Sequence, residues 1–283
     1  MGSMTRLDRV VAMRVGVVGA GGRMGREVCR TLLSRPGVDL VAAVDPAHAG
    51  ADLSALLGAE PGGLAVAAGL DALVDASAEV AVDFTRLEAA RETLAFCADA
   101  GIHAVVGTSG FTEADLADLA RRFAPTAGRR ANCVLAANFA IGAVLMMRFA
   151  TIAAPFFDAA EIVELHHEGK LDAPSGTALR TAEAMAAARA EAGTAAFAGD
   201  ATEVEVLEGA RGGAGPDGVR IHSVRLPGLV AHQEVLFGAV GQGLTIRHDS
   251  YDRASFMDGV VLAVEAVAGR PGLTLGIEPL LGL

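Results

Sequence analysis

Short apolar runs alternate with helically spaced segments through the first half of the chain. Met24, Val28 and Leu32 recur at helical spacing and predict a helix over Arg23–Ser34. The other predicted elements are a helix at Leu87–Ala100 and strands at Arg14–Val18, Leu40–Val44, Val80–Phe84 and Ala104–Val106. Apolar strands separated by helices are typical of a parallel sheet that is covered on both faces. The pattern therefore predicts an α/β domain.

The pattern changes after about residue 137. Several later runs alternate between apolar and polar residues with glycine turns between them, which indicates a mixed or antiparallel sheet. The expected strands are Glu161–His167, Val219–Arg225, Glu234–Val240 and Leu244–His248, and the expected helices are Ile141–Phe157, Thr177–Ala192 and Arg253–Gly269. Residues 198–218 are rich in glycine and predict a long surface loop. With 283 residues, the chain has room for this second, α+β domain.

Composition excludes several classes of protein. Hydrophobic residues make up 52% of the chain and charged residues 20%, which excludes a disordered or fibrous protein. The net charge is −11 and no basic run occurs, so we expect no nucleic-acid partner. The longest apolar stretch, Phe139–Met147, is too short to cross a bilayer, and we expect no membrane partner. Residues 1–12 show no clear cleavage site, so no signal peptide is expected.

The cysteines indicate a reducing compartment. Cys29, Cys97 and Cys133 are odd in number and far apart, and no CxxC pair exists. Neither a disulfide framework nor a metal site is therefore expected, and a cytoplasmic location fits. Cys133 lies in an apolar run, where a buried thiol is usually inert, so we do not expect it to be a nucleophile.

A glycine-rich turn joins the first predicted strand to the first predicted helix. Its sequence, Gly19–Ala20–Gly21–Gly22–Arg23–Met24–Gly25, lets backbone N–H groups approach a pyrophosphate at a helix N-terminus. Asp45 ends the second predicted strand, where a carboxylate can bind a ribose hydroxyl. Met24 stands where the usual GxGxxG motif has its third glycine. The glycines alone could also form a turn without binding a dinucleotide. The strand, the helix and the acid together favour a dinucleotide site.

The choice of coenzyme stays open at this point. An acid at Asp45 favours the free 2′-hydroxyl of NADH, and Pro46 stands where a basic residue would accept the 2′-phosphate of NADPH. Arg23 could still reach that phosphate, so NADH, NADPH or both remain as cofactors.

The only lysine of the chain, Lys170, follows a pair of histidines. All the other basic residues are arginines, and lysine differs from arginine in being a compact ammonium whose pKa is adjustable. His166 and His167 face opposite ways in a regular strand, so a shared site requires a bend, for which Gly169 is suited. The alternatives are a solvated loop lysine and histidines that serve only packing; no nearby cluster has the spacing of metal ligands.

A helix start follows this lysine at Pro174–Ser175–Gly176–Thr177. Its hydroxyls and free N–H groups suit a carboxylate, although simple capping would use the same residues. Lys170, His167 and the helix start together indicate a pocket for a small dicarboxylate. Gly107–Thr108–Ser109–Gly110 follows a predicted strand at the same sheet edge and could face a nicotinamide. Ala136–Ala137–Asn138–Phe139 lies where the pattern changes, as a hinge would.

These motifs together resemble the 4-hydroxy-tetrahydrodipicolinate reductase family of the diaminopimelate and lysine pathway. The resemblance rests on GAGGRMG at 19–25, DFT at 83–85, GTSG at 107–110, AANF at 136–139, ELHHEGKLDAPSGTA at 164–178 and HSVRLPG at 222–228. It implies a Rossmann dinucleotide-binding domain (1–137 with 249–283) and a substrate-binding and oligomerisation domain (138–248). It also implies a homotetramer and a heterocyclic dicarboxylate as substrate.

The resemblance also implies roles for single residues. His166 and Lys170 would be catalytic, and His167, Gly176 and Thr177 would bind the substrate carboxylate. The coenzyme would contact Gly19, Ala20, Gly21, Gly22, Arg23, Met24, Asp45, Gly107, Thr108, Ser109, Ala136, Ala137, Asn138 and Phe139. NAD(P)H would deliver a hydride to C4 of the ring after the 4-hydroxyl leaves, and a general acid would add the proton.

The sequence departs from the family pattern at two places. Glu168 adds negative charge near a dianionic substrate, and Pro46 replaces the arginine that some members carry, which disfavours a strong preference for NADPH. Two other functions stay open: another two-domain NAD(P)H dehydrogenase of a small amino or keto diacid, and a dinucleotide-sensing module without activity.

Overall fold

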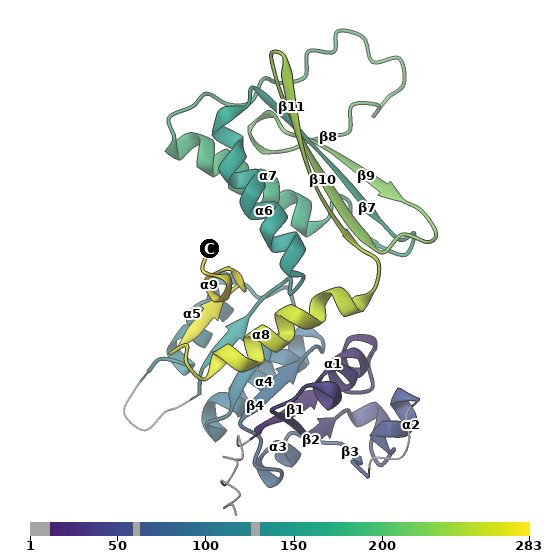
Figure 1. Ribbon diagram of the computed structural model, residues 1–283, viewed down its shortest axis with the longest axis vertical. Helices are drawn as coiled ribbons and strands as arrows, with labels where there is room; N and C mark the ends of the chain where they lie inside the picture. The colour runs from purple at the N-terminus through teal and green to yellow at the C-terminus, as the bar shows by residue number, and fades with distance from the viewer. Residues whose placement is uncertain (1–11, 59–62, 126–130) are drawn as a thin grey trace, which may run out of the picture. The chain divides into compact units, whose positions relative to one another are not determined.

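The chain divides into two compact units in the computed structural model, which describes residues 12–58, 63–125 and 131–283 (Figure 1). Unit 1 comprises the described residues up to Phe139 together with Phe256–Leu283, and unit 2 comprises Ala140–Ser255. The sequence had placed these two boundaries at 137/138 and 248/249. The expectation about a signal peptide concerns residues 1–12, of which only Ala12 is among the described residues.

A parallel sheet forms the centre of unit 1. Within the described residues it has seven strands in the order β12-β6-β5-β4-β1-β2-β3. The strands are β1 (Met13–Val18), β2 (Val38–Val44), β3 (Val66–Ala67), β4 (Val80–Asp83), β5 (His103–Val106), β6 (Cys133–Leu135) and β12 (Leu273–Leu275). Because all neighbours in this sheet run parallel, the carboxyl ends of the strands lie at one edge.

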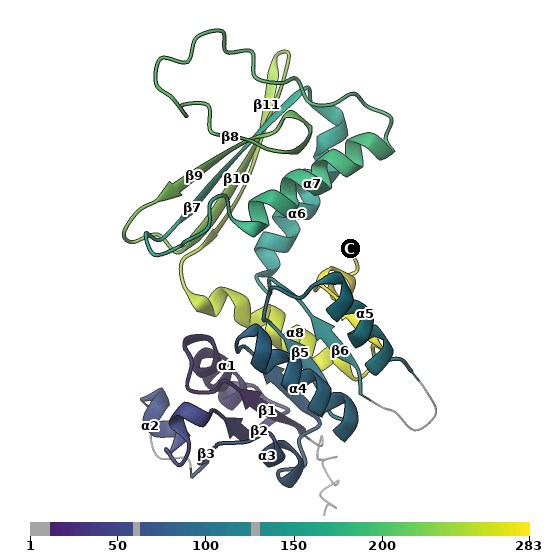
Figure 2. The same ribbon diagram turned by 180° about the vertical axis from the view of Figure 1, so that it is seen from behind.

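Helices cover both faces of this sheet. They are α1 (Arg23–Ser34), α2 (Leu53–Leu57), α3 (Asp71–Asp75), α4 (Leu87–Ala100), α5 (Glu113–Arg122), α8 (Met257–Val267) and α9 (Glu278–Leu281). Figure 1 shows α1 and α8 in front of the sheet, and Figure 2 shows α4 and α5 on the other side. Both faces of the strands are therefore apolar, as in Val15 and Val17 on one side and Val18 on the other, all nearly inaccessible to solvent.

Unit 2 contains a mixed sheet with two helices packed against it. Its order is β11-β10-β7-β9-β8 in the described chain; β7 and β9 are parallel, whereas β10 is antiparallel to both β7 and β11. The elements are α6 (Ile141–Ala153), β7 (Ala159–His166), α7 (Gly176–Glu191), β8 (Gly213–Ala214), β9 (Arg220–Arg225), β10 (Ala231–Ala239) and β11 (Gln242–Ser250). Apolar residues of α6, α7 and the sheet form one core, which includes Ile162, Met185 and Val235. The α/β fold with a second mixed sheet, expected from the sequence, is confirmed.

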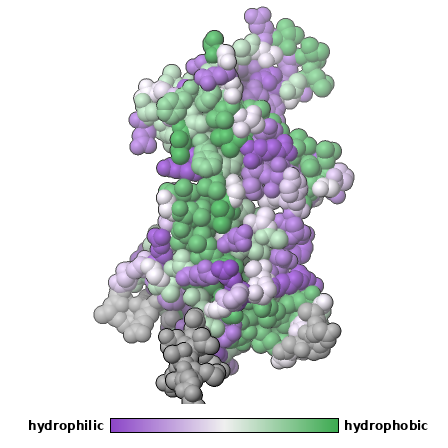
Figure 3. Space-filling model, viewed as in Figure 1, coloured by the Kyte–Doolittle hydropathy of each residue, from purple (hydrophilic) through white to green (hydrophobic). Residues whose placement is uncertain are grey.

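Apolar side chains lie exposed in the long segment between α7 and β8. Val204, Val206 and Leu207 are 73%, 94% and 73% exposed, and Figure 3 shows hydrophobic surface on this loop. The sequence predicted a loop over 198–218, and the structure adds the short strand β8 within that range. No helix among the described residues combines the length and apolar character needed to cross a bilayer.

Candidate active site

The glycine-rich turn lies between β1 and α1. Gly19 has a φ of 76°, which favours glycine, and helix α1 begins after Gly22 without a side-chain cap. Gly25 lies so close to the turn that an added Cβ would come within 2.0 Å of the carbonyl oxygen of Gly19. Thus Gly25 provides the close approach between helix and turn for which the GxGxxG motif uses its third glycine. The uncapped helix start and the bare turn fit a pyrophosphate.

Asp45 lies directly beside this turn. It is 9% exposed, and its carboxylate accepts hydrogen bonds from the N–H groups of Gly21 (2.9 Å) and Ala47 (3.0 Å). His48, which the sequence analysis did not single out, places its Nδ1 3.1 Å from Asp45 Oδ1 and its ring over Gly21. The carboxylate is therefore fixed next to the turn, at the position where a ribose would bind.

The GTSG segment helps to line a hollow at the carboxyl ends of β4 and β5. This hollow of about 360 Å³ is bordered by Met24, Phe84, Thr85, Arg86, Leu87, Gly107, Thr108 and Ser109. Thr108 Oγ1 donates to the carbonyl oxygen of Thr85 at 3.1 Å, which ties the two strand ends together. Beneath them burial raises the pKa of Asp83, although hydrogen bonds from threonines oppose this shift.

The AANF segment follows β6 at the same edge. The N–H of Ala136 donates to the carbonyl oxygen of Val106 at 3.0 Å, and the ring of Phe139 lies 5.6 Å from that of Phe84. The structure thus gathers the predicted coenzyme residues, Gly19–Met24, Asp45, Gly107–Ser109 and Ala136–Phe139, at one edge of the sheet in unit 1.

The predicted catalytic residues lie at the end of β7 in unit 2. His166 ends the strand, and a turn follows in which the N–H of Lys170 donates to the carbonyl oxygen of His167 at 3.1 Å. Lys170 is partly buried, and its Nζ donates to Asp172 Oδ1 at 2.7 Å. His167 is exposed on the turn. The hydrogen bond from Lys170 lowers the pKa of Asp172.

Helix α7 begins close to these residues. Ser175 caps the helix, since its side chain accepts a hydrogen bond from the N–H of Ala178 at 3.1 Å. Gly176 and Thr177 form its first turn and are partly exposed. The N–H of Ser175 itself donates to the Glu164 carboxylate at 3.2 Å.

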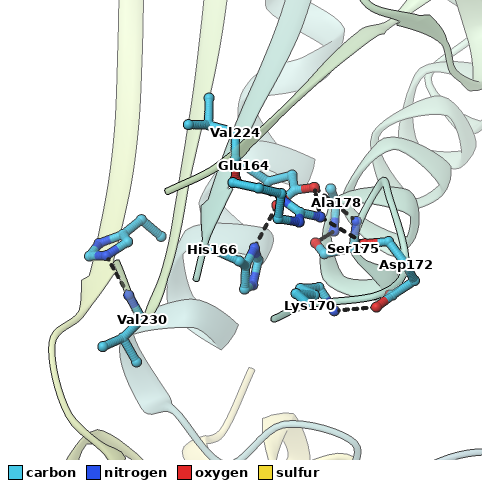
Figure 4. A network of polar contacts seen from close by, with 10 residues as sticks. Glu164, His166, Lys170, Asp172, Ser175, Ala178, Val224 and Val230 are labelled. Carbon is cyan, nitrogen blue, oxygen red and sulfur yellow. Dashed lines mark hydrogen bonds and ion pairs between the residues drawn. The ribbon is translucent and has the colours of Figure 1, made fainter. Parts of the chain in front are cut away.

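One buried carboxylate connects these parts of the site (Figure 4). Glu164 Oε2 lies 2.5 Å from His166 Nδ1, and both oxygens accept from Arg225, at 2.8 and 2.9 Å. Arg225 also donates to the carbonyl oxygen of Asp172 at 2.8 Å. Burial alone would raise the pKa of Glu164, but the hydrogen bonds from His166 and Arg225 lower it to about 2. Glu164 is therefore ionised at neutral pH.

Sequence reasoning missed Glu164, Arg225, Asp172 and His48 as parts of the site. Two signals were present: Glu164 and His166 alternate on one strand and so share a face, and Arg225 belongs to the quoted HSVRLPG segment. That Arg225 pairs with His166 across β7 and β9 is visible only in the sheet register.

Other candidate chemistries find no support in the structure. Burial raises the pKa of the Cys133 thiol, and it raises those of Cys29 and Cys97 to about 12. Among the described residues there is no group of three or more side chains that could hold a metal ion.

Two family models together match most of the chain; the first ends at the boundary after Phe139, and the second covers nearly all of unit 2 and continues into the last segment of unit 1. The model described as dihydrodipicolinate reductase, N-terminus, matches residues 13–139, and the one described as dihydrodipicolinate reductase, C-terminus, matches residues 142–281. The chain belongs to the dihydrodipicolinate reductase family. The resemblance that the sequence motifs indicated is thereby confirmed.

Relatives in this family match almost the full chain. A 4-hydroxy-tetrahydrodipicolinate reductase of Nocardia farcinica is 48% identical over 96% of this chain and 100% of its own length. One from Mycolicibacterium vanbaalenii is 51% identical with the same two coverages. A solved structure of dipicolinate-bound dihydrodipicolinate reductase from Paenisporosarcina sp. TG-14 aligns with a TM-score of 0.80 and 40% identity, over 95% of this chain and 99% of that one.

Proposed function

We propose that the chain catalyses the NAD(P)H-dependent reduction of 4-hydroxy-tetrahydrodipicolinate to tetrahydrodipicolinate, on the route to diaminopimelate and lysine. Family membership of both halves and the name shared by its near-full-length relatives support this activity. The observation that carries it is the β7–α7 segment, where His166 and the start of α7 contact one buried carboxylate and Lys170 is linked to it through Asp172 and Arg225.

The substrate is proposed to bind through its two carboxylates. Lys170 offers an ammonium and Thr177 a hydroxyl, while Gly176 stands in the first turn of α7, where N–H groups lack helical acceptors. His167 lies exposed on the preceding turn and completes the set. Asp172 Oδ1 accepts a hydrogen bond from Lys170 Nζ, and this ion pair restricts the position of the ammonium group.

The reaction requires a hydride and a proton. Bound NAD(P)H would supply the hydride for C4 of the ring, from which the 4-hydroxyl leaves as water. His166 is proposed to deliver the proton to the neighbouring ring carbon, and Lys170 to stabilise the negative charge that develops. A positioned general acid of this kind contributes roughly 10²–10⁴-fold to a rate.

The coenzyme is proposed to bind at the sheet edge of unit 1. The turn Gly19–Met24 would hold the pyrophosphate, Asp45 the adenosine ribose, and Gly107–Ser109 with Ala136–Phe139 the nicotinamide side. The fixed carboxylate of Asp45 favours NADH, whereas the exposed Arg23 at the start of α1 permits NADPH as well.

Four copies are proposed to assemble through unit 2. Leu236 and Leu244 on β10 and β11 are each 37% exposed, and Val240 between them is 99% exposed. Together with the apolar loop at Val204–Leu207, these residues offer surface that a subunit contact would cover. We also propose a cytoplasmic location, in line with the biosynthetic activity proposed above.

The decisive test of the activity is NADH oxidation with freshly generated 4-hydroxy-tetrahydrodipicolinate. Turnover that depends on this substrate, with tetrahydrodipicolinate as the product, is expected. Oxidation of NADH only with other amino or keto diacids would identify a different dehydrogenase, and binding of NADH without any turnover would identify a binding module.

The coenzyme assignment has its own test. Asp45→Ala is expected to raise the KM for NADH about tenfold and to leave kcat nearly unchanged, because the ribose contact is lost from ground state and transition state alike. Asp39→Ala removes an exposed carboxylate from the same strand and serves as the control. The kcat/KM for NADH is compared with that for NADPH in the wild type, in Asp45→Ala and in Asp39→Ala. An unchanged KM in Asp45→Ala would contradict the ribose contact.

A further inference from the structure

The Glu164 side chain is inaccessible to solvent and accepts hydrogen bonds from several neighbouring residues. Its Oε2 contacts His166 Nδ1 and Arg225 Nη1, and its Oε1 accepts from Arg225 Nη2 and from the N–H of Ser175. Figure 4 shows the carboxylate between the histidine ring and the start of α7. A further side-chain hydrogen bond, from Ser223, also lowers the pKa of Glu164, and together these donors hold the buried carboxylate in place.

This contact decides which nitrogen of His166 carries the proton. A carboxylate accepts hydrogen bonds and donates none, so His166 Nδ1 must be the protonated nitrogen. The neutral ring then has its lone pair on Nε2, and a proton picked up at Nε2 is the one that the ring can pass on. Glu164 therefore leaves one ring nitrogen for exchange with a substrate.

Arg225 keeps the carboxylate ionised and in place. Its guanidinium binds both oxygens of Glu164, and it also donates to the carbonyl oxygens of Val224 and Asp172. Asp172 in turn accepts from Lys170 Nζ. The ion pair between Glu164 and Arg225 thus contacts His166, the loop that carries Lys170, and Ser175 at the start of α7.

We propose that Glu164, held by Arg225, is a positioning residue for the reduction: it fixes the ring of His166 with the proton on Nδ1, so that Nε2 serves as the proton donor. The inference rests on the proposed function, because it assigns the proton transfer to His166. It adds two residues to the site that contact neither substrate nor coenzyme in this scheme and act through the histidine.

Glu164→Gln is the variant that tests this role. The amide keeps the shape of the side chain, but only one of its two ends accepts hydrogen bonds. With its oxygen at the Oε1 position, where it accepts from Arg225 Nη2 and the N–H of Ser175, its NH₂ group faces His166 and Arg225 Nη1. The backbone N–H of Ser175 can only donate, whereas His166 can change its tautomer, so Nδ1 accepts and the proton of the neutral ring moves to Nε2. We expect kcat to fall about 100-fold, while the KM for the substrate and the dissociation constant of NADH change less than threefold.

The chain offers a matched control in Glu161→Gln. Glu161 lies on the same strand, contacts the ring of His222 at Nε2 (2.7 Å) and forms an ion pair with Arg211, so it has the same kinds of partners. Its substitution removes the same charge three positions away. We expect the kcat of Glu161→Gln to equal that of the wild type. An equal loss of activity in both variants would assign the effect to charge or folding and overturn the proposal.

¹⁵N NMR of protein labelled at histidine reports the tautomer without any turnover. The signals of His166 are identified as those that His166→Gln lacks among the seven histidines. We expect the Nδ1–H form in the wild type and in Glu161→Gln, and the Nε2–H form in Glu164→Gln. The same tautomer in wild type and Glu164→Gln, or wild-type kcat despite a changed tautomer, would overturn the proposal.

The two hypotheses fail in different ways. If the wild type does not reduce the heterocycle, the proposed function fails, yet the spectra still show whether Glu164 sets the tautomer of His166.

If Glu164→Gln does not fold, Arg225→Lys provides a second test, because it replaces the two hydrogen bonds to the carboxylate with a single donor and leaves the carboxylate in place. It is expected to lower kcat about tenfold with His166 still protonated at Nδ1; an unchanged kcat would contradict the role of Arg225.

Discussion

At the scale of single residues, the chain uses lysine only at Lys170, among 23 basic residues. The structure gives a physical context for this choice. The side chain is partly buried, ends 2.7 Å from Asp172 Oδ1, and belongs to a turn that Arg225 anchors through the carbonyl oxygen of Asp172. A compact ammonium suits this position better than a planar guanidinium, whose donors require several acceptors at fixed angles.

Lys170→Ala is expected to lower kcat at least 100-fold, because the developing negative charge loses its cation. Binding of NADH, followed by fluorescence titration, should stay at the wild-type level. Arg121→Ala removes an exposed arginine from α5 in unit 1 and controls for the loss of one positive charge. Unchanged turnover in Lys170→Ala would rule out its catalytic role.

The residue types of the site were predictable, whereas their partners were not. The motif around Lys170, together with the family resemblance, identified His166, His167, Gly176 and Thr177 as candidates. Arg225 lies 61 positions from Glu164, and a contact at that separation follows from the pairing of β7 with β9. Local patterns carry no information about such pairings.

At the scale of elements, two long helices were predicted with their bounds, whereas several other elements were missed, among them the ten-residue helix α5. Helices α1 and α4 have the predicted bounds, Arg23–Ser34 and Leu87–Ala100, because many residues contribute to one helical period. Strands β6 and β12 have three residues each and were missed, since so short a run has no period of its own. The predicted helix at Arg253–Gly269 begins instead with a 3₁₀ turn, Arg253–Phe256, before α8.

The close contact between α1 and the glycine turn gives a prediction at this scale. Gly25→Ala places a methyl group against the carbonyl oxygen of Gly19, so either the helix or the turn must shift. We expect the free energy of unfolding to fall by about 1–3 kcal/mol and the dissociation constant of NADH to rise about tenfold. Urea unfolding and NADH titration measure the two effects.

Gly69→Ala is the control for this variant, because an added Cβ at Gly69 meets nothing within 4 Å. It should leave both quantities unchanged. Wild-type NADH affinity in Gly25→Ala would show that the coenzyme does not depend on the geometry of this turn.

At the scale of the whole molecule, the ionised Glu164 makes stability depend on pH. Its pKa in the folded chain is about 2, compared with an ordinary value of 4.5. The folded state therefore binds this proton more weakly than the unfolded state, and the stabilisation is complete above pH 4.5 and is lost as the pH falls towards 2. Burial shifts the pKa of Asp83 upward, so its contribution has the opposite sign.

We expect the difference in unfolding free energy between wild type and Glu164→Gln to shrink as the pH falls from 4.5 to 2. Asp83 is present in both proteins, and its contribution cancels in this difference. Urea unfolding at a series of pH values provides the measurement. A difference that stays constant across this range would contradict the ionised state of Glu164 in the folded chain.

The sequence by itself determined the alternation of strands and helices, the glycine turn with its acid, and the lysine–histidine segment, because each depends on residues that are near neighbours in the chain. The tertiary structure decided which side chains act on one another. It placed the segments predicted to bind the coenzyme at one sheet edge, and it brought Arg225 and the start of α7 to the carboxylate of Glu164. Those contacts join distant positions, and their geometry is set by strand register and by burial, which no local pattern encodes.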